Sequence, residues 1–291
     1  MSGRTIRPSG AARESKTSSG GRIDFAGSDL PLTEDEAAKV EGGILQIPLA
    51  AGAVVIAYNL PDAEGLKLSR EAISGIFLGE IQRWNDPLIQ AANKGVDLPN
   101  MPITLVARLD ASGTCFVTTR HLSAISEQFA KIIGDTMTPV WPEIIKERGA
   151  LIRGKGNGGV GAYIKAVPGS IGYVQYAYAH LTDLQMASLQ NQAGEFISPN
   201  SESFKAAVES FKAELDPLNI ADPRSPGAYP ILSLSWLITR KNQEDAEKAK
   251  ALKDVVRYCL ADGQEAAALL GYIPLTEQAV RQILHRLDSI N

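Results

Sequence analysis

The sequence is poor in the features that mark several classes of protein. It has only two cysteines, Cys115 and Cys259, too few for a disulfide framework, so we expect both to be reduced structural thiols. No apolar run approaches the roughly 18 residues that span a bilayer. The net charge is only -4 and the basic residues are scattered, which argues against a nucleic-acid-binding protein. Any anion site must therefore be local.

What the 291 residues do contain is an alternation of short apolar segments with amphipathic ones, which favours an α/β architecture. Thr33 and Glu36 predict a capping box at the start of a short helix, and Ser69 precedes another helix. The stretches Gly154–Gly161 and Pro217–Pro230 are predicted loops. We predict strands at residues 22–26, 44–49, 53–58, 103–107, 171–175 and 231–239.

The stretch "ITLVARLDASGT" places polar groups where a strand ends and a helix begins. A helix that begins at Ser112 presents unpaired backbone N–H groups, and the hydroxyls of Ser112 and Thr114 add donors for an anion. Arg108 can place a planar guanidinium against the same anion, and Asp110 can hold that guanidinium. The alternative is an ordinary helix cap beside a surface ion pair. The spacing alone leaves both interpretations open.

A second segment, "RIDFAGSDLPL", repeats this arrangement and brings Asp29 to the end of a strand. An ionised carboxylate can only accept hydrogen bonds, so Asp29 would repel a fully ionised anion and accept a proton from one that still carries hydrogen. Its alternative role is that of a loop or cap aspartate.

Two catalytic interpretations are weak. The stretch Gly149–Gly156 nearly matches a phosphate-binding P-loop, but Gly156 stands where that motif needs Ser or Thr for magnesium. Cys115, His121 and Asp110 could form a nucleophile set, but Cys115 and His121 are six positions apart on a helix and point to different sides. We therefore expect no enzyme activity.

The histidines and tryptophans carry no further chemistry. His121, His180 and His285 lack the spacing of a metal site, so we expect no metal or cofactor and three solvated surface histidines. Trp84 and Trp236 are expected in buried aromatic packing rather than against a ligand.

Several segments, taken in order, resemble the periplasmic phosphate-binding proteins of bacterial high-affinity phosphate ABC transporters. The resemblance runs from about Ser9 to the C-terminus and rests on "DFAGSD", "FLGEIQRWNDPLI", "RLDASGT", "GKGNGGVGAYIKAVPGSIGYVQYAYA", "YPI" and "LGYIPL". It implies a type II periplasmic-binding-protein-like fold, in which two lobes joined by crossover strands enclose a ligand cleft. Lobe 1 would comprise residues 1–53 and 230–291, and lobe 2 residues 54–229.

The resemblance also implies a function and a set of site residues. The protein would bind inorganic phosphate in the cleft, without catalysis, and deliver it to the membrane permease of an ABC transporter from the periplasm or another extracytoplasmic space. Asp110 would be the partner of Arg108, and Asp29 the acceptor that selects protonated phosphate over sulfate. The implied phosphate ligands are Ser9, Asp29, Arg108, Ser112, Gly113 and Thr114.

The N-terminus departs from the family, because members begin with a strand, a turn and a helix before the serine turn at Ser9. The first residues also lack the apolar middle of a signal peptide. Because the family's first strand is absent, we expect two facing strand edges in lobe 1 with unpaired backbone groups, so that lobe 1 is either poorly stable or pairs with a strand from another chain. The alternative function is a structural or accessory subunit of an assembly, with weak or no phosphate binding.

Overall fold

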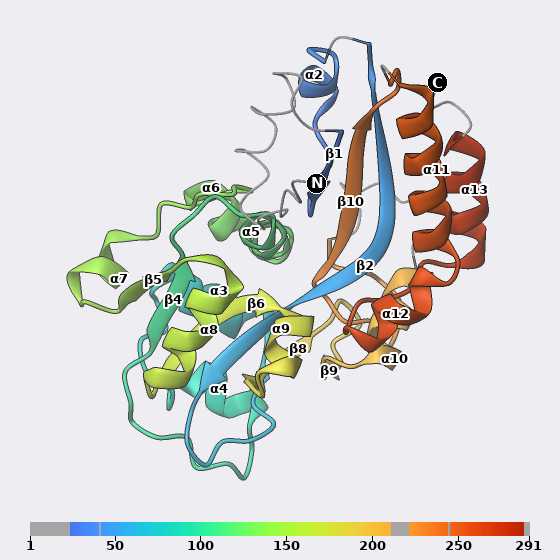
Figure 1. Cartoon of the computed structure of the whole chain (residues 1–291). Helices are drawn as coiled ribbons and strands as arrows, with labels where there is room; N and C mark the ends of the chain where they lie inside the picture. The colour runs from blue at the N-terminus through green and yellow to red at the C-terminus, as the bar shows by residue number, and fades with distance from the viewer. Residues whose placement is uncertain (1–23, 41, 211–220, 244, 288–291) are drawn as a thin grey trace.

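The computed structural model describes residues 24–40, 42–210, 221–243 and 245–287, which form an α/β fold of two lobes (Figure 1). Within these residues, one sheet has the order β1-β10-β2-β6-β4-β5 with β7 beside β2, and a small second sheet has the order β3-β8-β9. The strands are β1 (Phe25–Ser28), β2 (Ile44–Asn59), β3 (Lys67–Leu68), β4 (Thr104–Arg108), β5 (Leu151–Gly154), β6 (Ser170–Gln175), β7 (Gln185–Met186), β8 (Ser188–Gln190), β9 (Phe196–Ile197) and β10 (Leu232–Arg240). The helices are α2 (Glu34–Ala37), α3 (Arg70–Leu78), α4 (Pro87–Ala92), α5 (Gly113–Ile125), α6 (Glu127–Ile132), α7 (Glu143–Glu147), α8 (Gly156–Ala166), α9 (Tyr176–Leu181), α10 (Ser201–Glu209), α11 (Ala246–Leu260), α12 (Gly263–Leu269) and α13 (Glu277–Leu287).

Strand β2 runs through both parts of the sheet (Figure 1). Its first part pairs with β10 as far as Ala53, and from Val54 onward it pairs with β6. The prediction of two separate strands, 44–49 and 53–58, is therefore wrong about the break. A Cβ atom on Gly52 would lie 3.0 Å from the Ser233 hydroxyl, so the glycine marks a close approach of β10 and not a turn.

The upper part of the sheet contains β1, β10 and β2, with α11 and α13 beside them (Figure 1). Strand β1 pairs antiparallel with β10, and β10 pairs antiparallel with β2. The expected pair of facing edges is therefore not found in the described part of the chain, because β10 lies directly between the other two strands. The predicted strand 22–26 begins at Phe25, and residues 22 and 23 lie outside the described residues.

The lower part contains the parallel strands β6, β4 and β5, against which α8 packs. The prediction of a loop over Gly154–Gly161 is wrong, because most of this stretch belongs to α8. A Cβ atom on Gly154 would lie 2.5 Å from the backbone of Gly159, and one on Gly161 would clash with the ring of Tyr178. The glycines thus allow close packing of a helix, which outweighs their low helix propensity.

The local predictions at helix starts are confirmed. Thr33 and Glu36 form a capping box, and the Ser69 hydroxyl accepts the Ala72 N–H at 3.1 Å. Trp84 and Trp236 are buried as expected. Both cysteines are free thiols.

One prediction about a side chain fails. His180 and His285 are exposed, but His121 is 2% exposed and lies near Arg70 and Asp222, which form an ion pair. Burial lowers the pKa of His121 to about 4, so the ring is neutral at pH 7. None of the helices in the described ranges is long and apolar enough to cross a membrane.

Candidate anion-binding site

The start of α5 is arranged as the sequence predicts. Ser112 is the N-cap, and its hydroxyl accepts the Cys115 N–H at 3.4 Å, so its own hydrogen remains available to donate. The first N–H groups of a helix have no intrahelical acceptor. Among the described residues, no acceptor is recorded for the N–H groups of Gly113 and Thr114. This helix terminus therefore offers several donors and a favourable dipole to an anion.

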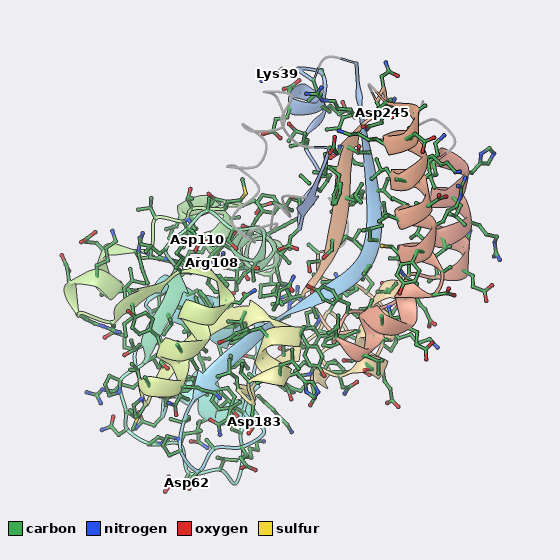
Figure 2. The ribbon with its side chains drawn as sticks, viewed as in Figure 1. Lys39, Asp62, Arg108, Asp110, Asp183 and Asp245 are labelled. Carbon is green, nitrogen blue, oxygen red and sulfur yellow. The ribbon has the colours of Figure 1, made fainter. Side chains whose placement is uncertain are left out.

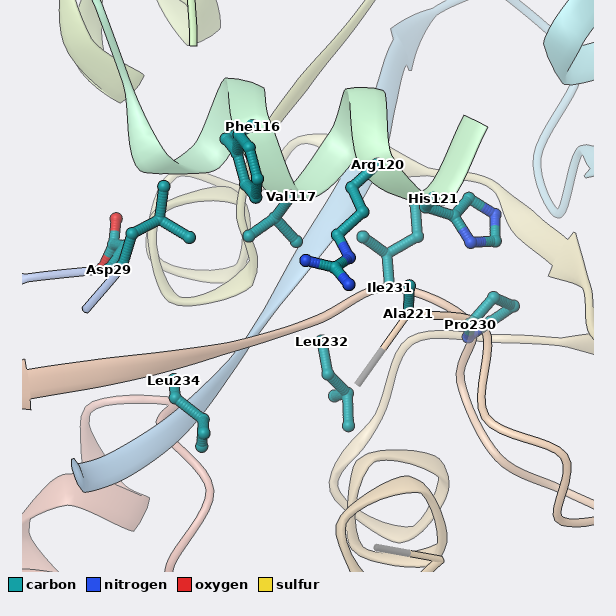
Figure 3. Close-up of a pocket in the computed structure, with 11 residues that line it drawn as sticks. Asp29, Phe116, Val117, Arg120, His121, Ala221, Pro230, Ile231, Leu232 and Leu234 are labelled. Carbon is teal, nitrogen blue, oxygen red and sulfur yellow. The ribbon is translucent and has the colours of Figure 1, made fainter. Parts of the chain in front are cut away.

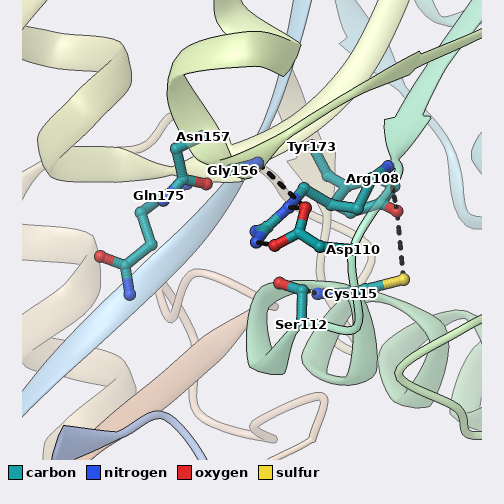
Figure 4. A network of polar contacts seen from close by, with 8 residues as sticks. All are labelled: Arg108, Asp110, Ser112, Cys115, Gly156, Asn157, Tyr173 and Gln175. Carbon is teal, nitrogen blue, oxygen red and sulfur yellow. Dashed lines mark hydrogen bonds and ion pairs between the residues drawn. The ribbon is translucent and has the colours of Figure 1, made fainter. Parts of the chain in front are cut away.

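Arg108, at the end of β4, is fixed by Asp110 (Figure 2 and Figure 4). Its Nε donates to Asp110 Oδ1 at 3.0 Å, and its Nη2 donates to Asp110 Oδ2 at 2.6 Å. A guanidinium has five N–H groups, and Asp110 takes two of them, so three remain for a ligand. The Arg108 side chain is only 8% exposed, which strengthens any interaction with an anion. The predicted pairing of these two residues is confirmed.

Asp110 is held in its ionised form. Burial would raise the pKa of its carboxyl group, but the Arg108 guanidinium and the N–H of Gly156, which donates to Oδ1 at 3.0 Å, together lower it to about 2. Gly156 is the first residue of α8, so Asp110 connects that helix to the strand that carries Arg108. The guanidinium therefore has a fixed orientation at all physiological pH values.

The backbone of Arg108 is also anchored. Its N–H donates to the hydroxyl of Tyr173 at 3.2 Å, and this hydroxyl donates to Cys115 Sγ at 3.1 Å (Figure 4). Burial raises the pKa of the Cys115 thiol to about 11. His121, which its spacing from Cys115 argues against as the base of a nucleophile set, lies near Asp222 and Arg70 and is neutral at pH 7. Cys115 is therefore a structural thiol.

Asp29 lies against the start of α5, although it is distant from that helix in the sequence. A Cβ atom on Gly113 would be 2.6 Å from Asp29 Cβ and 3.3 Å from Asp29 Oδ2, so only glycine permits this approach. Burial raises the pKa of Asp29, while the charge of Arg108 and the nearby Ser235 side chain act against that rise. The structure thus brings Asp29 together with Arg108, Ser112, Gly113 and Thr114. Ser9 lies outside the described residues.

A small cavity of about 10 Å³ continues from Asp29 along α5 (Figure 3). Its walls are mainly apolar side chains of α5 and β10, among them Phe116, Val117 and Leu232. Arg120 and His121 line its other end. Such a volume holds about one water molecule. The two parts of the protein therefore meet closely beside Asp29.

Sequence reasoning missed two features near the site. It did not find that Ser235 lies near Asp29, or the buried position of His121. Neither carries a local sequence signal, because the first depends on the pairing of β1 with β10 and the second on the packing around α5.

The fold and this arrangement of donors around one acceptor define a solute-binding protein of the PBP superfamily. The sequence model described as the PBP superfamily domain matches residues 7–262. The α/β two-lobed fold expected from the sequence is confirmed by solved structures. A phosphate-binding protein from Stenotrophomonas maltophilia has a TM-score of 0.74 at 20% identity, over 96% of this chain and 85% of that one. The ancestral soluble variant of the human phosphate binding protein has a TM-score of 0.76 at 19% identity, over 94% and 85%.

Curated relatives identify the family within this class. The phosphate-binding protein PstS of Pasteurella multocida is 38% identical over 266 residues, which cover 90% of this chain and 75% of the relative. The phosphate-binding protein PstS of Xylella fastidiosa (strain Temecula1) is also 38% identical, over 90% and 71%. The chain belongs to the PstS family of phosphate-binding proteins, as the sequence motifs indicate.

Proposed function

We propose that this protein binds inorganic phosphate reversibly, as the solute-binding component of a phosphate ABC transporter. The observation that carries the proposal is the Arg108 guanidinium, fixed by Asp110 beside the free N–H groups of α5 and opposite the Asp29 carboxylate. The names of the PstS relatives support it. They give no support to the alternative of an accessory subunit without phosphate binding.

The proposed ligands divide into donors and one acceptor. Arg108, Ser112, Gly113 and Thr114 donate to the phosphate oxygens, with Asp110 as the support for Arg108. Asp29 accepts a hydrogen bond from a protonated phosphate oxygen. Ser9 would add a hydroxyl from the N-terminal segment. Nothing in this scheme requires a bond of the ligand to break, so the function is binding and not catalysis.

The proposed lobes are residues 1–53 with 230–291 and residues 54–229. In support of these limits, β2 exchanges β10 for β6 between Ala53 and Val54, and β10 begins at Leu232. The phosphate would lie where Asp29, from lobe 1, meets α5, from lobe 2. Closure of the lobes around it would then exclude water and strengthen the hydrogen bonds.

The proposed partner is the membrane permease of the transporter, and the proposed location is the periplasm or an equivalent extracytoplasmic space. One solved relative is described as a high affinity periplasmic phosphate-binding protein. A second chain that completes lobe 1 would pair with β1, which stands at the edge of the described sheet with β10 on its other side. Such a strand would satisfy the outer backbone groups of β1.

Isothermal titration calorimetry of the full chain with phosphate and with sulfate tests the proposal. We expect phosphate to bind in a 1:1 ratio and sulfate to bind far more weakly at neutral pH, because sulfate has no proton to donate to Asp29. A protein that binds neither anion, or both equally well, would contradict the proposed function or the proposed role of Asp29.

A further inference from the structure

Ser233 and Gln175 flank β2 at the place where it exchanges β10 for β6. In the two ladders, Ser233 of β10 is opposite Gly52, and Gln175 of β6 is opposite Val54. Residues that are directly opposite each other point to the same face of a sheet, and so do residues two positions apart on one strand. The side chains of Ser233 and Gln175 therefore lie on one face of the sheet, on either side of β2.

Gly52 leaves the space between these two side chains open. A Cβ atom on Gly52 would lie 3.0 Å from Ser233 Oγ and 3.8 Å from Gln175 Nε2, so both polar atoms border the position that a larger residue would fill. The ring of Tyr272, with its Cδ1 atom 3.9 Å from the same position, adds an apolar wall. Any side chain at residue 52 would separate the two polar groups.

Both polar groups are buried and lack a partner. Ser233 is 1% exposed, and its hydroxyl has no hydrogen-bond partner among the described residues. Gln175 is 9% exposed, and its backbone N–H donates to Asn157 Oδ1 at 3.3 Å. Its side-chain amide extends away from Asn157 (Figure 4) and has no recorded partner in the part of the chain that the structure describes. Because a buried polar group without a partner is destabilising, each of the two groups can supply what the other lacks.

We propose that Gln175 and Ser233 form a hydrogen bond across Gly52 when the anion site is closed, and that both are positioning residues for the bound phosphate. This inference rests on the proposed function. Ser233 belongs to the strand that pairs with β1, which leads to Asp29, whereas Gln175 belongs to the strand that pairs with β4, which carries Arg108. The bond would therefore join the acceptor side of the site to its donor side.

The bond requires only a rotation of side chains. The last torsion of a glutamine side chain has a broad range, and its amide group can donate through Nε2 or accept through Oε1. A serine hydroxyl can serve as either partner. Asp29 already lies against Gly113 at the start of α5, so the two sides of the site are in contact in this conformation. A bond that exists only while they are in contact favours the closed form and slows the release of the ligand.

A double-mutant cycle tests the inference. Ser233→Ala removes the hydroxyl, Gln175→Met keeps the length of the side chain without its hydrogen-bonding groups, and the double variant removes both. Gln185→Met is the matched control, because it is the same substitution at a glutamine whose Oε1 accepts the Leu60 N–H at 3.2 Å, away from Gly52. Calorimetry with inorganic phosphate gives the dissociation constants, and stopped-flow mixing gives the dissociation rates. Urea titrations give the stability of each ligand-free variant.

We expect each single variant to raise the dissociation constant for phosphate by roughly fivefold, which corresponds to one hydrogen bond between neutral groups, mainly through faster dissociation. The double variant should bind no more weakly than either single variant, whereas their effects on ligand-free stability should add. Gln185→Met should lower stability and leave the dissociation constant unchanged.

Two results would overturn the inference while phosphate still binds to the unaltered protein. The first is an unchanged dissociation constant in both single variants. The second is a double variant in which the two losses of affinity simply add, because independent effects on packing would produce that sum. If the unaltered protein binds no phosphate, the proposed function fails, and the inference fails with it.

Discussion

Replacement of Arg108 by alanine is the most direct test of the site. The substitution removes the three N–H groups that Asp110 leaves free for a ligand. It also leaves the Asp110 carboxylate without its guanidinium partner, so that the N–H of Gly156 becomes its main hydrogen-bond donor. The negative charge of Asp110 would then repel the incoming anion. Loss of one partner of a buried charged pair costs about 2–5 kcal/mol. We therefore expect the dissociation constant for phosphate to rise roughly 30- to 5,000-fold.

Two further variants separate the contributions. Arg108→Ala combined with Asp110→Asn removes the unpaired carboxylate, so it should recover the part of the loss that comes from repulsion. Arg153→Ala is the matched control, because Arg153 is exposed and stands on β5 next to the residue that precedes Arg108. Its affinity for phosphate should not change. Calorimetry at constant ionic strength measures all three, and circular dichroism confirms that each variant is folded.

Two results would refute this reasoning. An unchanged affinity in Arg108→Ala would remove Arg108 from the site. Full recovery in the double variant would mean that Arg108 acts only by neutralising Asp110 and makes no contact with phosphate.

Four other predictions concern the same site and its sheet. Asp29→Asn should relax the discrimination against sulfate at pH 7, measured by calorimetric competition; sulfate that stays excluded would contradict the acceptor role. Gly113→Ala should weaken phosphate binding by about 1–3 kcal/mol because its Cβ would force Asp29 away, whereas Gly158→Ala, which meets no atom within 4 Å, should bind normally. The lowered pKa of Asp110, about 2, contributes stability that is complete above its ordinary pKa and is lost as the pH falls from about 4 to 2; urea titrations should show a smaller acid loss in Asp110→Asn. Hydrogen exchange should show weaker protection in β1 than in β10 if the outer edge of β1 awaits a partner, and equal protection in a confirmed monomer would contradict this.

The local parts of the site could be predicted from the sequence. Arg108, Asp110 and Ser112 lie within five residues, so the strand end, the ion pair and the helix cap follow from chemistry and short-range geometry. Asp29 had an informative residue type and position, but its contact with Gly113 follows from packing. The resemblance to a family supplied that pairing in advance.

The remainder depends on long-range contacts. The position of Ser235 near Asp29 requires the pairing of β1 with β10, and this register has no signal in the residues around Ser235. His121 was expected in solvent because a single histidine on a helix does not reveal which face is covered. The glycines of α8 were interpreted as a loop because the tight contact between Gly154 and Gly159 exists only after the helix has docked.

The continuity of β2 has a mechanical consequence. Because β2 passes from one sheet partner to the other as one continuous strand, rotation of one part of the protein against the other must bend a hydrogen-bonded strand near Ala53. A strand that remains paired on both sides of the bend gains little backbone entropy when the cleft opens. Opening and closing of the cleft should therefore occur by elastic bending of β2 around one preferred conformation. The rate of ligand release should then depend on the strain that this bending stores in the sheet.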